Sequence, residues 1–407
     1  MNRPLVSVVM VVFNVDAFLA ESIESILGQT FKDFEFIIVD FGSTDKTKTI
    51  VSSYAAKDGR ITLHEVPNCG LAAARNAGGL LAQGRYIAIM DADDVSLPNR
   101  LKWQVDFLEK HPEVSLVGGA TEWIDANGRS LGIHRFPTED HKINSTLVIE
   151  FPLCHPTVLI RTRTFVLIGG YREAFVFGED YDLWLRIVEQ FRCANLSQVV
   201  LKYRNHPCQV QSSRARQQTL CLLAAQASAS LRRNGKPDLF NSIKEITPAV
   251  LAALGVTEAK QRVTADRDWI RAMDEAGRYS TALNAATEAL HSADWEYAER
   301  WEIASMRLTV ARLYWKERRF ARSFLTVGHA FIARPAMLVR PLKPFLRWFR
   351  FRWATTLGQR TPFSTRSMST DLPDVGGPSK SGERWLERAE LQTVASPREE
   401  MRCPKTN

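Results

Sequence analysis

The chain has 407 residues, of which 45% are hydrophobic, and its 53 lysines and arginines against 45 acids give a formal net charge of +8. This length exceeds one hydrophobic core, so we expect two domains and a tail. The six cysteines lack the spacing of disulfide pairs or metal sites, and no secretory leader is recognised before Val6, which predicts a reducing, cytosolic compartment. Apolar runs stay below the roughly 18 residues that span a bilayer, which argues against a membrane-embedded protein.

The chain opens with alternating strands and helices. Residues 5–13 form a nearly unbroken, valine-rich run, which predicts a strand buried on both faces. Residues 16–27 have the apolar spacing of an amphipathic helix. Strands are predicted over 34–39, ending at Asp40, and over 61–65, and a helix rich in small residues opens at Gly70. This rhythm predicts an α/β fold in which a parallel sheet carries helices on its faces.

The stretch from 85 to 94 is the most informative part of the sequence. Its apolar run predicts a buried strand, which ends in an Asp-x-Asp pattern at Asp91, Asp93 and Asp94. Oxygen ligands at a strand tip suit Mg²⁺ or Mn²⁺, which proteins bind through one or two carboxylates together with substrate phosphates. The alternative is an acidic loop that caps a helix in which Pro98 takes the first position.

Several polar residues are predicted to meet at one edge of the sheet. Asn14, Asp40 and the carboxylates at 91–94 all follow predicted strands. Ligands of parallel sheets bind beyond the carboxyl ends of the strands. Independent motifs that converge on this edge favour a ligand site over a set of helix caps.

These stretches resemble a known family. Residues 6–14, 39–45, 68–76 and 90–94 are similar to motifs of the family-2 inverting glycosyltransferases with the GT-A fold, and 155–157, 169–172 and 178–184 continue the pattern in order. The resemblance extends to about His206. It implies a Rossmann-like nucleotide-diphospho-sugar transferase sheet and a hexosyltransferase type of enzyme. It also implies inverting transfer from a nucleotide-diphosphate donor, usually UDP-linked, to a saccharide or lipid-linked acceptor in polysaccharide or glycan biosynthesis.

The resemblance also implies roles for the residues that bind the donor. Asp40 would hydrogen-bond the nucleobase, and Arg75 would lie near the donor phosphates or sugar. Asn14 belongs to the same nucleotide-sugar-binding set. Asp93 would be the direct ligand of Mn²⁺ or Mg²⁺, and Asp91 would be a metal ligand that lies nearer the ribose.

Asp180 matches the catalytic base of the family, and Glu179 lies beside it. Inverting transfer needs a base to remove the acceptor proton and a metal to stabilise the departing diphosphate. A helical apolar pattern begins at Leu183, so Asp180 is predicted at a helix N-terminus, which lowers a carboxyl pKa. Its basicity would then depend on partial burial and on Glu179. The alternative is that Asp180 only caps the helix.

Three further residues are predicted to contact the acceptor or the phosphates. His155 precedes a predicted strand over 158–160 and would either be satisfied by the backbone in the acceptor cleft or contact the acceptor or leaving diphosphate. His206 sits where some relatives place a histidine near the metal. Trp184 is predicted to pack in its helix or to form a stacking platform for the acceptor.

The chain departs from the family pattern at a few positions. Phe41 replaces a common second acidic residue and could flank the nucleobase, and Val11 and Phe13 replace a proline and a tyrosine. Two alternative functions remain open. A sugar-phosphate nucleotidyltransferase would need a glycine-rich, basic loop where the chain has 14–18. A non-catalytic scaffold with a sugar-nucleotide fold is favoured by Phe41 alone.

The second half has a different character. We expect the catalytic domain over 1–210 and a helical module over 211–335. Two segments of this module resemble each other loosely, and each has an aromatic residue, Tyr279 or Phe320, between two helices. This predicts helical hairpins like those of tetratricopeptide proteins, although the period is longer than that of the 34-residue repeat.

The end of the chain is basic and then polar. Between Arg312 and Arg360 there are twelve lysines and arginines and one acid, Glu317. Residues 336–360 mix these cations with aromatics, which favours binding to an anionic membrane surface and a peripheral location on the inner face of the cell membrane. The alternatives are a solvated basic helix and, less favoured, a nucleic-acid contact. Residues 361–407 have the composition of a disordered tail.

Overall fold

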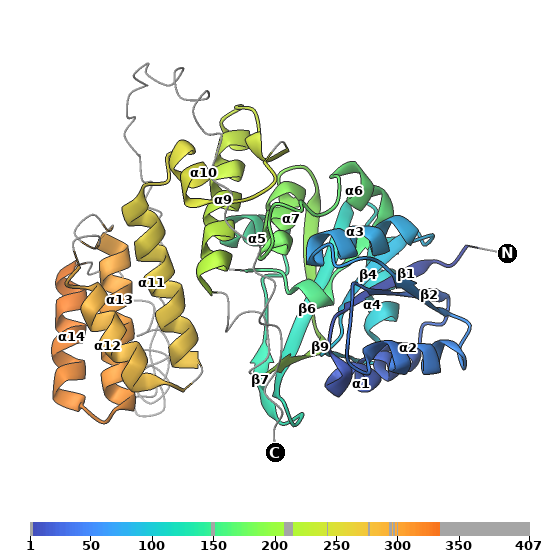
Figure 1. The fold of residues 1–407 in the computed structure, drawn as a ribbon, viewed down its shortest axis with the longest axis horizontal. Helices are drawn as coiled ribbons and strands as arrows, with labels where there is room; N and C mark the ends of the chain where they lie inside the picture. Colours follow the sequence, from blue (N-terminus) through green and yellow to red (C-terminus); the bar gives the residue numbers. More distant parts are fainter. Residues whose placement is uncertain are drawn as a thin grey trace, which may run out of the picture. The chain divides into compact units, whose positions relative to one another are not determined.

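The structure is a computed structural model that describes residues 3–147, 151–206, 215–241, 243–275, 277–292, 295, 298 and 300–333 (Figure 1). The chain divides into two units, 1–335 and 336–407. The predicted basic aromatic segment at 336–360 and the predicted tail at 361–407 lie outside the described residues, as does the predicted domain boundary near 210, so these three remain predictions.

The first four strands are parallel, as the sequence predicts. They are β1 (Val6–Val12), β2 (Phe34–Asp40), β3 (Ile61–Glu65) and β4 (Tyr86–Asp91), in the spatial order β3-β2-β1-β4. The connecting helices are α1 (Asp16–Leu27), α2 (Thr47–Ala55) and α3 (Leu71–Leu81). Because these four strands are parallel, all four of their carboxyl ends lie on one edge of the sheet.

Side chains of β1 alternate between two hydrophobic clusters, one on each face of the sheet. Val8 and Met10 pack in the same cluster as residues of α1, α2 and α4 (Arg100–Lys110). Val9 packs on the opposite face, in the cluster that includes residues of α3, α6 (Thr162–Leu167) and α7 (Glu179–Val188). Figure 1 shows the helices on both sides of the sheet. The prediction of a strand buried on both faces is confirmed.

Beyond β4 the sheet is mixed, so the parallel arrangement that the first strands predict does not extend to the whole sheet. Among the described residues nine strands form one sheet, which continues from β4 through β8 (Leu159–Arg161), β6 (Val114–Asp125) and β9 (Arg192–Asn205) to β5 (Val95–Ser96), while β7 (Ser130–His134) pairs with β6. β8 runs antiparallel to both β4 and β6. The strand–helix rhythm breaks because β6 and β7 form a hairpin, and Asp125 accepts hydrogen bonds from Asn127 and Arg129 in its turn.

The helix after β4 starts later than expected. α4 begins at Arg100, so Pro98 does not take the first position of this helix. Two backbone contacts hold this stretch in an extended path. The Leu97 N–H donates to the Val200 carbonyl, and the Pro98 carbonyl accepts from the Thr30 N–H. The short elements α5 (Asp140–Thr146) and η1 (His155–Thr157) complete the first half.

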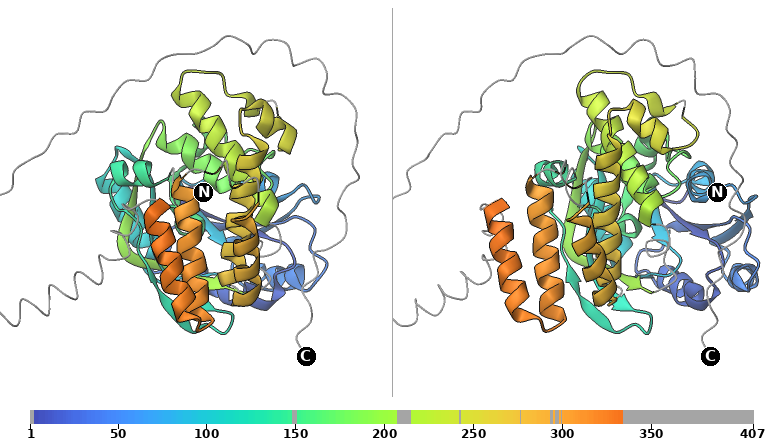
Figure 2. Two further views of the ribbon diagram at one scale, coloured as in Figure 1. Left: turned by 90° about the vertical axis from the view of Figure 1, so that its left-hand side faces the viewer. Right: turned by 60° about the vertical axis from the view of Figure 1, so that its left-hand side comes forward.

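The second half is helical, as predicted. Its elements are α9 (Ala215–Arg233), η2 (Leu239–Asn241), α10 (Pro248–Ala253), α11 (Glu258–Glu275), α12 (Tyr279–Ala289), α13 (Arg300–Lys316) and α14 (Phe320–Ala333). Residues of α9 join the same hydrophobic cluster as α7, whereas α11, α12 and α13 share a separate core around Ile270 and Leu313. Figure 2 shows α11 to α14 side by side. Tyr279 and Phe320 each begin the second helix of a hairpin, which confirms the predicted hairpins. No helix in the described part of the chain is apolar over enough length to cross a bilayer.

Candidate active site

The strand register brings the predicted donor-binding residues to one edge of the sheet. At the end of β1, Val12 pairs with Asp40 of β2, and Val11 pairs with Asp91 of β4. Asp40 and Asp91 therefore flank the same strand end from its two sides. Asn14 lies two residues after the end of β1, in a left-handed backbone conformation with φ of 48°. We call this edge, with the loops that follow β1, β2 and β4, the carboxyl edge.

Asn14 and Asp40 build the loops at the carboxyl edge. The Asn14 amide oxygen accepts from the Thr44 N–H at 2.8 Å, and the Asn14 N–H donates to the Ser43 hydroxyl. The Asp40 Oδ1 accepts from the N–H groups of Gly42 and Ser43, both at 2.8 Å. Its other oxygen is buried and has no hydrogen-bond partner. A buried carboxylate oxygen without a donor is costly, so it is suited to a donor group on a ligand.

Phe41 and Phe13, two of the departures from the family pattern, contact each other. Their rings stack with centroids 4.8 Å apart and an interplanar angle of 27°. Phe41 also packs in a cluster with Val39 and Ala74 and is largely buried. The two substituted residues thus form one aromatic pair, and Phe41 of this pair directly follows Asp40 in the sequence.

Arg75 joins two motifs that are distant in sequence. Its guanidinium, on α3, forms an ion pair with Glu179 of α7 and a second one with Asp91 of β4, with Nη2 3.2 Å from the Asp91 Oδ1. The Arg75 and Glu179 side chains are only 12% and 5% exposed. Burial raises the pKa of Glu179 to about 7, because desolvation and the charges of Asp180 and Asp91 together outweigh the attraction of Arg75.

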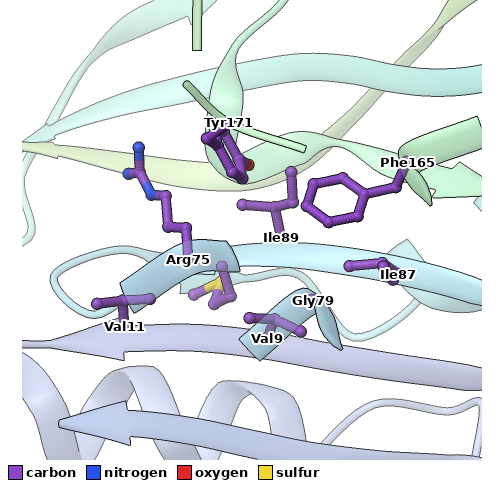
Figure 3. Close-up of a pocket in the computed structure, with 9 residues that line it drawn as sticks. Val9, Val11, Arg75, Gly79, Ile87, Ile89, Phe165 and Tyr171 are labelled. Carbon is purple, nitrogen blue, oxygen red and sulfur yellow. The ribbon is translucent and has the colours of Figure 1, made fainter. Parts of the chain in front are cut away.

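Figure 3 shows Arg75 and Tyr171 beside a small cavity that is otherwise lined by apolar side chains. Its volume is about 10 Å³, enough for no more than about one water molecule. The Arg75 guanidinium lies 5.7 Å from the centroid of the Tyr171 ring. This close packing limits the positions that the guanidinium can take, so its two ion pairs are held in place.

His155 contacts side chains rather than the backbone. Its Nε2 lies 3.0 Å from the Tyr171 hydroxyl, and its Nδ1 lies 3.6 Å from the Asp91 Oδ1. Burial raises the pKa of Asp91, but the nearby His155 ring and Arg75 guanidinium outweigh this effect and hold that pKa well below its usual range. The ring centroid of Trp184 lies 5.9 Å from that of His155, and Trp184 is fully buried, so it packs against the histidine.

Asp93 and His206 form a second contact at the carboxyl edge. The His206 Nε2 lies 3.0 Å from the Asp93 Oδ2, and the His206 ring packs 4.8 Å from the ring of Phe18 on α1. Arg204 supports this pair because its guanidinium donates to the Asp93 carbonyl and pairs with Glu21. The end of β9 is therefore fixed against the loop that follows β4.

Asp94 is an unusual member of the acidic loop. It is fully buried; one carboxylate oxygen accepts from the Arg204 N–H at 2.8 Å, and the other has no partner. Burial raises the pKa of Asp94 well above its usual range, and the charges of Asp93 and Asp91 raise it further. The like charges of these carboxylates repel one another, and a divalent cation would reduce this repulsion.

The residues of the loop fit a metal that shares its ligands with a substrate. Among the described residues, no three His, Cys, Asp or Glu side chains gather as a protein-only metal site requires. Asp93 and His206 nevertheless supply one carboxylate and one imidazole within 3.0 Å of each other. Mn²⁺ and Mg²⁺ commonly take one or two carboxylates from the protein and complete their shell with phosphate oxygens and water.

Asp180 lies in the first turn of α7, as predicted. Gly178 precedes the helix with φ of 91°, a conformation that favours glycine. The Asp180 carboxylate accepts from the Tyr181 N–H at 2.8 Å and is partly exposed, whereas Glu179 turns inward to Arg75. The two adjacent acids thus have different environments, one facing the buried cation and one accessible at the positive end of the helix.

The sequence patterns gave no role to Tyr171 or Arg204, which the structure brings into the site. Tyr171 is fixed by Asn76, whose amide donates to the Tyr171 carbonyl and accepts from its N–H, both at 2.8 Å. The only signal for Tyr171 was its place in the motif at 169–172. Arg204 lies two residues before His206 and had no signal of its own.

A larger pocket lies at the end of β7. Its volume is about 490 Å³, and it is lined by His134, Arg135, Phe136, Pro137, Thr146, Phe151 and Pro152. The ring of Phe151 packs 4.9 Å from that of Tyr181, the residue after Asp180. We call it the Phe151 pocket.

Comparison with known proteins identifies the family. The family model described as "Glycosyl transferase family 2" matches residues 7–167. An uncharacterised glycosyltransferase of Methanocaldococcus jannaschii is 37% identical over 211 residues, which are 50% of this chain and 72% of that protein. The O-antigen biosynthesis glycosyltransferase WbnJ of Escherichia coli is 34% identical over 213 residues, 51% of this chain and 83% of that protein.

Solved structures resemble the chain more loosely. TarS 1–349 of S. aureus in complex with UDP-GlcNAc has a TM-score of 0.47 and 17% identity, covering 79% of this chain and 90% of that one. The mannosyltransferase PcManGT from Pyrobaculum calidifontis, in complex with GDP-Man and Mn²⁺, has a TM-score of 0.44 and 18% identity, covering 82% and 86%. The sequence relatives carry the assignment: this chain is a glycosyltransferase that belongs to glycosyltransferase family 2, with the GT-A fold.

Proposed function

We propose that the chain transfers a sugar from a UDP-linked donor to a hydroxyl of a saccharide or lipid-linked acceptor, with inversion, in the synthesis of a polysaccharide such as an O-antigen. The observation that carries this proposal is the double ion pair of Arg75, which joins Asp91 at the end of β4 to Glu179 beside Asp180. It brings the donor-binding carboxylates and the motif of the base into one site. The relative named for O-antigen biosynthesis supports the polysaccharide context.

The nucleotide would bind where β1 and β2 end. The unpaired Asp40 oxygen is an acceptor for an N–H group of the nucleobase, and uracil has such a group. The loop in which the Asn14 N–H donates to the Ser43 hydroxyl would border the base. Phe41 and Phe13 stack on each other beside this loop, so they would provide an apolar wall rather than the second acid common in the family.

Asp93 and His206 would hold Mn²⁺ or Mg²⁺, with Asp91 directed to the ribose side of the donor. Such an ion, when bound, supplies a positive charge that stabilises the departing diphosphate. The chain adds its own cation, because Arg75 is kept charged and oriented by Glu179 and Asp91. A guanidinium held by two carboxylates loses little freedom when a phosphate or sugar oxygen approaches it.

Asp180 would act as the base. The acceptor oxygen forms a bond to the anomeric carbon while its proton passes to the Asp180 carboxylate. The bond from that carbon to the diphosphate oxygen breaks, and its electron pair leaves with the diphosphate. Glu179 lies beside Asp180 but turns inward to Arg75, so Asp180 is the acid of this pair that an acceptor could reach.

The Phe151 pocket is a suitable place for the acceptor. Phe136 and Phe151 offer faces on which a sugar ring can pack, and His134 and Arg135 offer hydrogen-bond donors. The contact between Phe151 and Tyr181 links this pocket to the helix that carries Asp180. An acceptor bound here would lie beside Phe151, which contacts the residue that follows Asp180.

The test of the proposed base separates donor binding from transfer. Asp180→Asn keeps the shape of the side chain and removes its ability to take a proton. We expect turnover of the UDP-sugar to fall by about 10²- to 10⁴-fold, while the Kd for the donor changes little. Asp106→Asn, on the exposed surface of α4, is the matched control and should keep full turnover. Full turnover in Asp180→Asn would remove Asp180 from the mechanism.

A further inference from the structure

The last helical hairpin exposes an apolar surface that the transfer reaction does not use. Five large side chains on α13 and α14 are between 46% and 78% exposed: Trp315, Phe320, Phe324, Leu325 and Ile332. Exposed apolar side chains that occur singly need no explanation, but a contiguous group of them marks an interaction surface. The ring of Trp315 packs against those of Phe320 and Phe324, with centroids 4.8 and 6.1 Å away, so these three are contiguous.

The face of α14 that is buried against α13 is the opposite of the one expected for a surface helix. Among the α14 side chains that the structure describes, the buried ones are small, namely Ser323 and Ala330, and the Ser323 hydroxyl donates to the Ala311 carbonyl of α13. The bulky residues of α14 point outward at helical spacing, at 320 and 324 and at 325 and 332. A surface helix normally buries its large apolar stripe against the core. Here the large stripe faces away from the hairpin.

Cations border this apolar stripe, and acids are absent from it. Arg318, Arg319 and Arg322 are all exposed, and residues 318–333 contain no Asp or Glu. In sequence the basic character continues, with seven lysines and arginines and no acid over 334–360. We call the surface formed by Trp315, Arg318, Arg319, Phe320, Arg322, Phe324, Leu325 and Ile332 the aromatic-arginine face.

We infer that the aromatic-arginine face binds an anionic lipid surface. An amphipathic helix with bulky apolar residues on one side and arginines along its border lies in the plane of a bilayer, with the apolar side in the acyl boundary. The arginines then meet anionic headgroups, to which they are attracted over about a Debye length. The charge of the face is complementary to that of such a surface, whereas a covering segment with the composition of 334–360 would add like charge to it.

This assignment does not depend on the donor chemistry proposed above. Membrane binding is also expected of residues 336–360 from their composition. The aromatic-arginine face is a second surface, and each of the two can be changed while the other is left intact. It also gives the helical hairpin a purpose, since an acceptor carried on a lipid would be presented at the same membrane surface.

The test measures cosedimentation of the full chain with vesicles of phosphatidylglycerol, and with vesicles of phosphatidylcholine for comparison. We expect binding to the anionic vesicles only, and loss of that binding as salt rises from about 0.1 M to about 0.5 M. Phe324→Ser/Leu325→Ser should weaken binding at least about tenfold, and Arg319→Gln/Arg322→Gln should do the same. Val166→Ser/Leu167→Ser, on the equally exposed surface of α6, is the matched control and should bind as the wild type does.

Three outcomes would overturn the inference. Equal loss of binding in the Val166/Leu167 control would mean that any exposed apolar pair contributes. Unchanged vesicle binding in Phe324→Ser/Leu325→Ser, together with a lower Tm without lipid, would mean that the face is covered by another part of this chain. A concentration-dependent mass in the wild type that this variant abolishes, with vesicle binding unchanged, would make the face a contact between two copies. Thermal melts of each variant guard against misfolding, and we expect Tm shifts below about 2 °C for surface changes.

Discussion

Arg75 and Glu179 lie 104 residues apart in sequence and form a buried ion pair. The pair connects α3 with the first turn of α7, and through the second contact of Arg75 it reaches the end of β4. Removing the guanidinium would leave two carboxylates, one of them buried, without their shared cation. The geometry of the proposed base and that of the donor carboxylates therefore depend on one another.

Removal of the cation alone should destabilise the fold. Arg75→Met leaves Glu179 buried without its partner, and we expect the free energy of unfolding to fall by about 3 kcal/mol. Glu179→Gln in the same chain should restore part of this loss, which gives a coupling energy of about 1–3 kcal/mol in a double-mutant cycle by urea unfolding.

The exposed pair Lys102 and Asp106 on α4 provides the control cycle, for which we expect a coupling below about 0.5 kcal/mol. Additive effects at Arg75 and Glu179 would contradict the account of a coupled buried pair.

Glu179 should also make stability depend on pH near neutrality. Its pKa is raised from 4.5 to about 7 in the folded chain, mainly by burial. The folded state then holds the proton more tightly than the unfolded state does. The stability that this adds is fully present below pH 4.5 and is lost as pH rises through about 7.

The measurement is urea unfolding of the wild type and of Glu179→Gln at a series of pH values. We expect the wild type to lose stability relative to the variant between about pH 5 and pH 8. If the free energies of unfolding of the two proteins change with pH in parallel, the pKa of Glu179 is the same in the folded and the unfolded chain, which would contradict this prediction. Asp91 acts in the opposite direction and in another window: its lowered pKa adds stability above pH 3.8, and this is lost as pH falls below that value.

Local patterns were sufficient to predict the part of the site that lies on the parallel strands. The valine-rich run at 5–13 and the apolar run that ends at Asp91 mark strands buried on both faces, and strands of this kind end at one edge. These patterns alone place Asp40 and Asp91 at the same edge, and β1 does lie between their two strands. The helix of Asp180 followed from the same kind of spacing.

Contacts that depend on the mixed part of the sheet could not be predicted. Tyr171 is held by Asn76, and Arg204 is held by Asp94, across 95 and 110 residues. Both pairs depend on how β8 and β9 enter the sheet, and β8 is only three residues long. The sequence predicts a strand over 158–160, but so short a run carries no signal for its direction or for the strands with which it pairs. The inward orientation of Glu179 could not be predicted either, because its partner lies on another helix.

The measurement that tests the central claim most directly is a thermal shift with UDP, with and without Mn²⁺. At a ligand concentration of about 100 times the Kd, binding adds about 2.7 kcal/mol, which raises the Tm by a few degrees in a chain of this size. We predict this shift for the wild type with Mn²⁺, and its loss both in chelator and in Asp93→Ala. His206→Ala should keep the shift but need a higher Mn²⁺ concentration to reach it. An equal shift in chelator, or a full metal-dependent shift in Asp93→Ala, would contradict a site in which Asp93 and His206 hold the ion that neutralises the diphosphate.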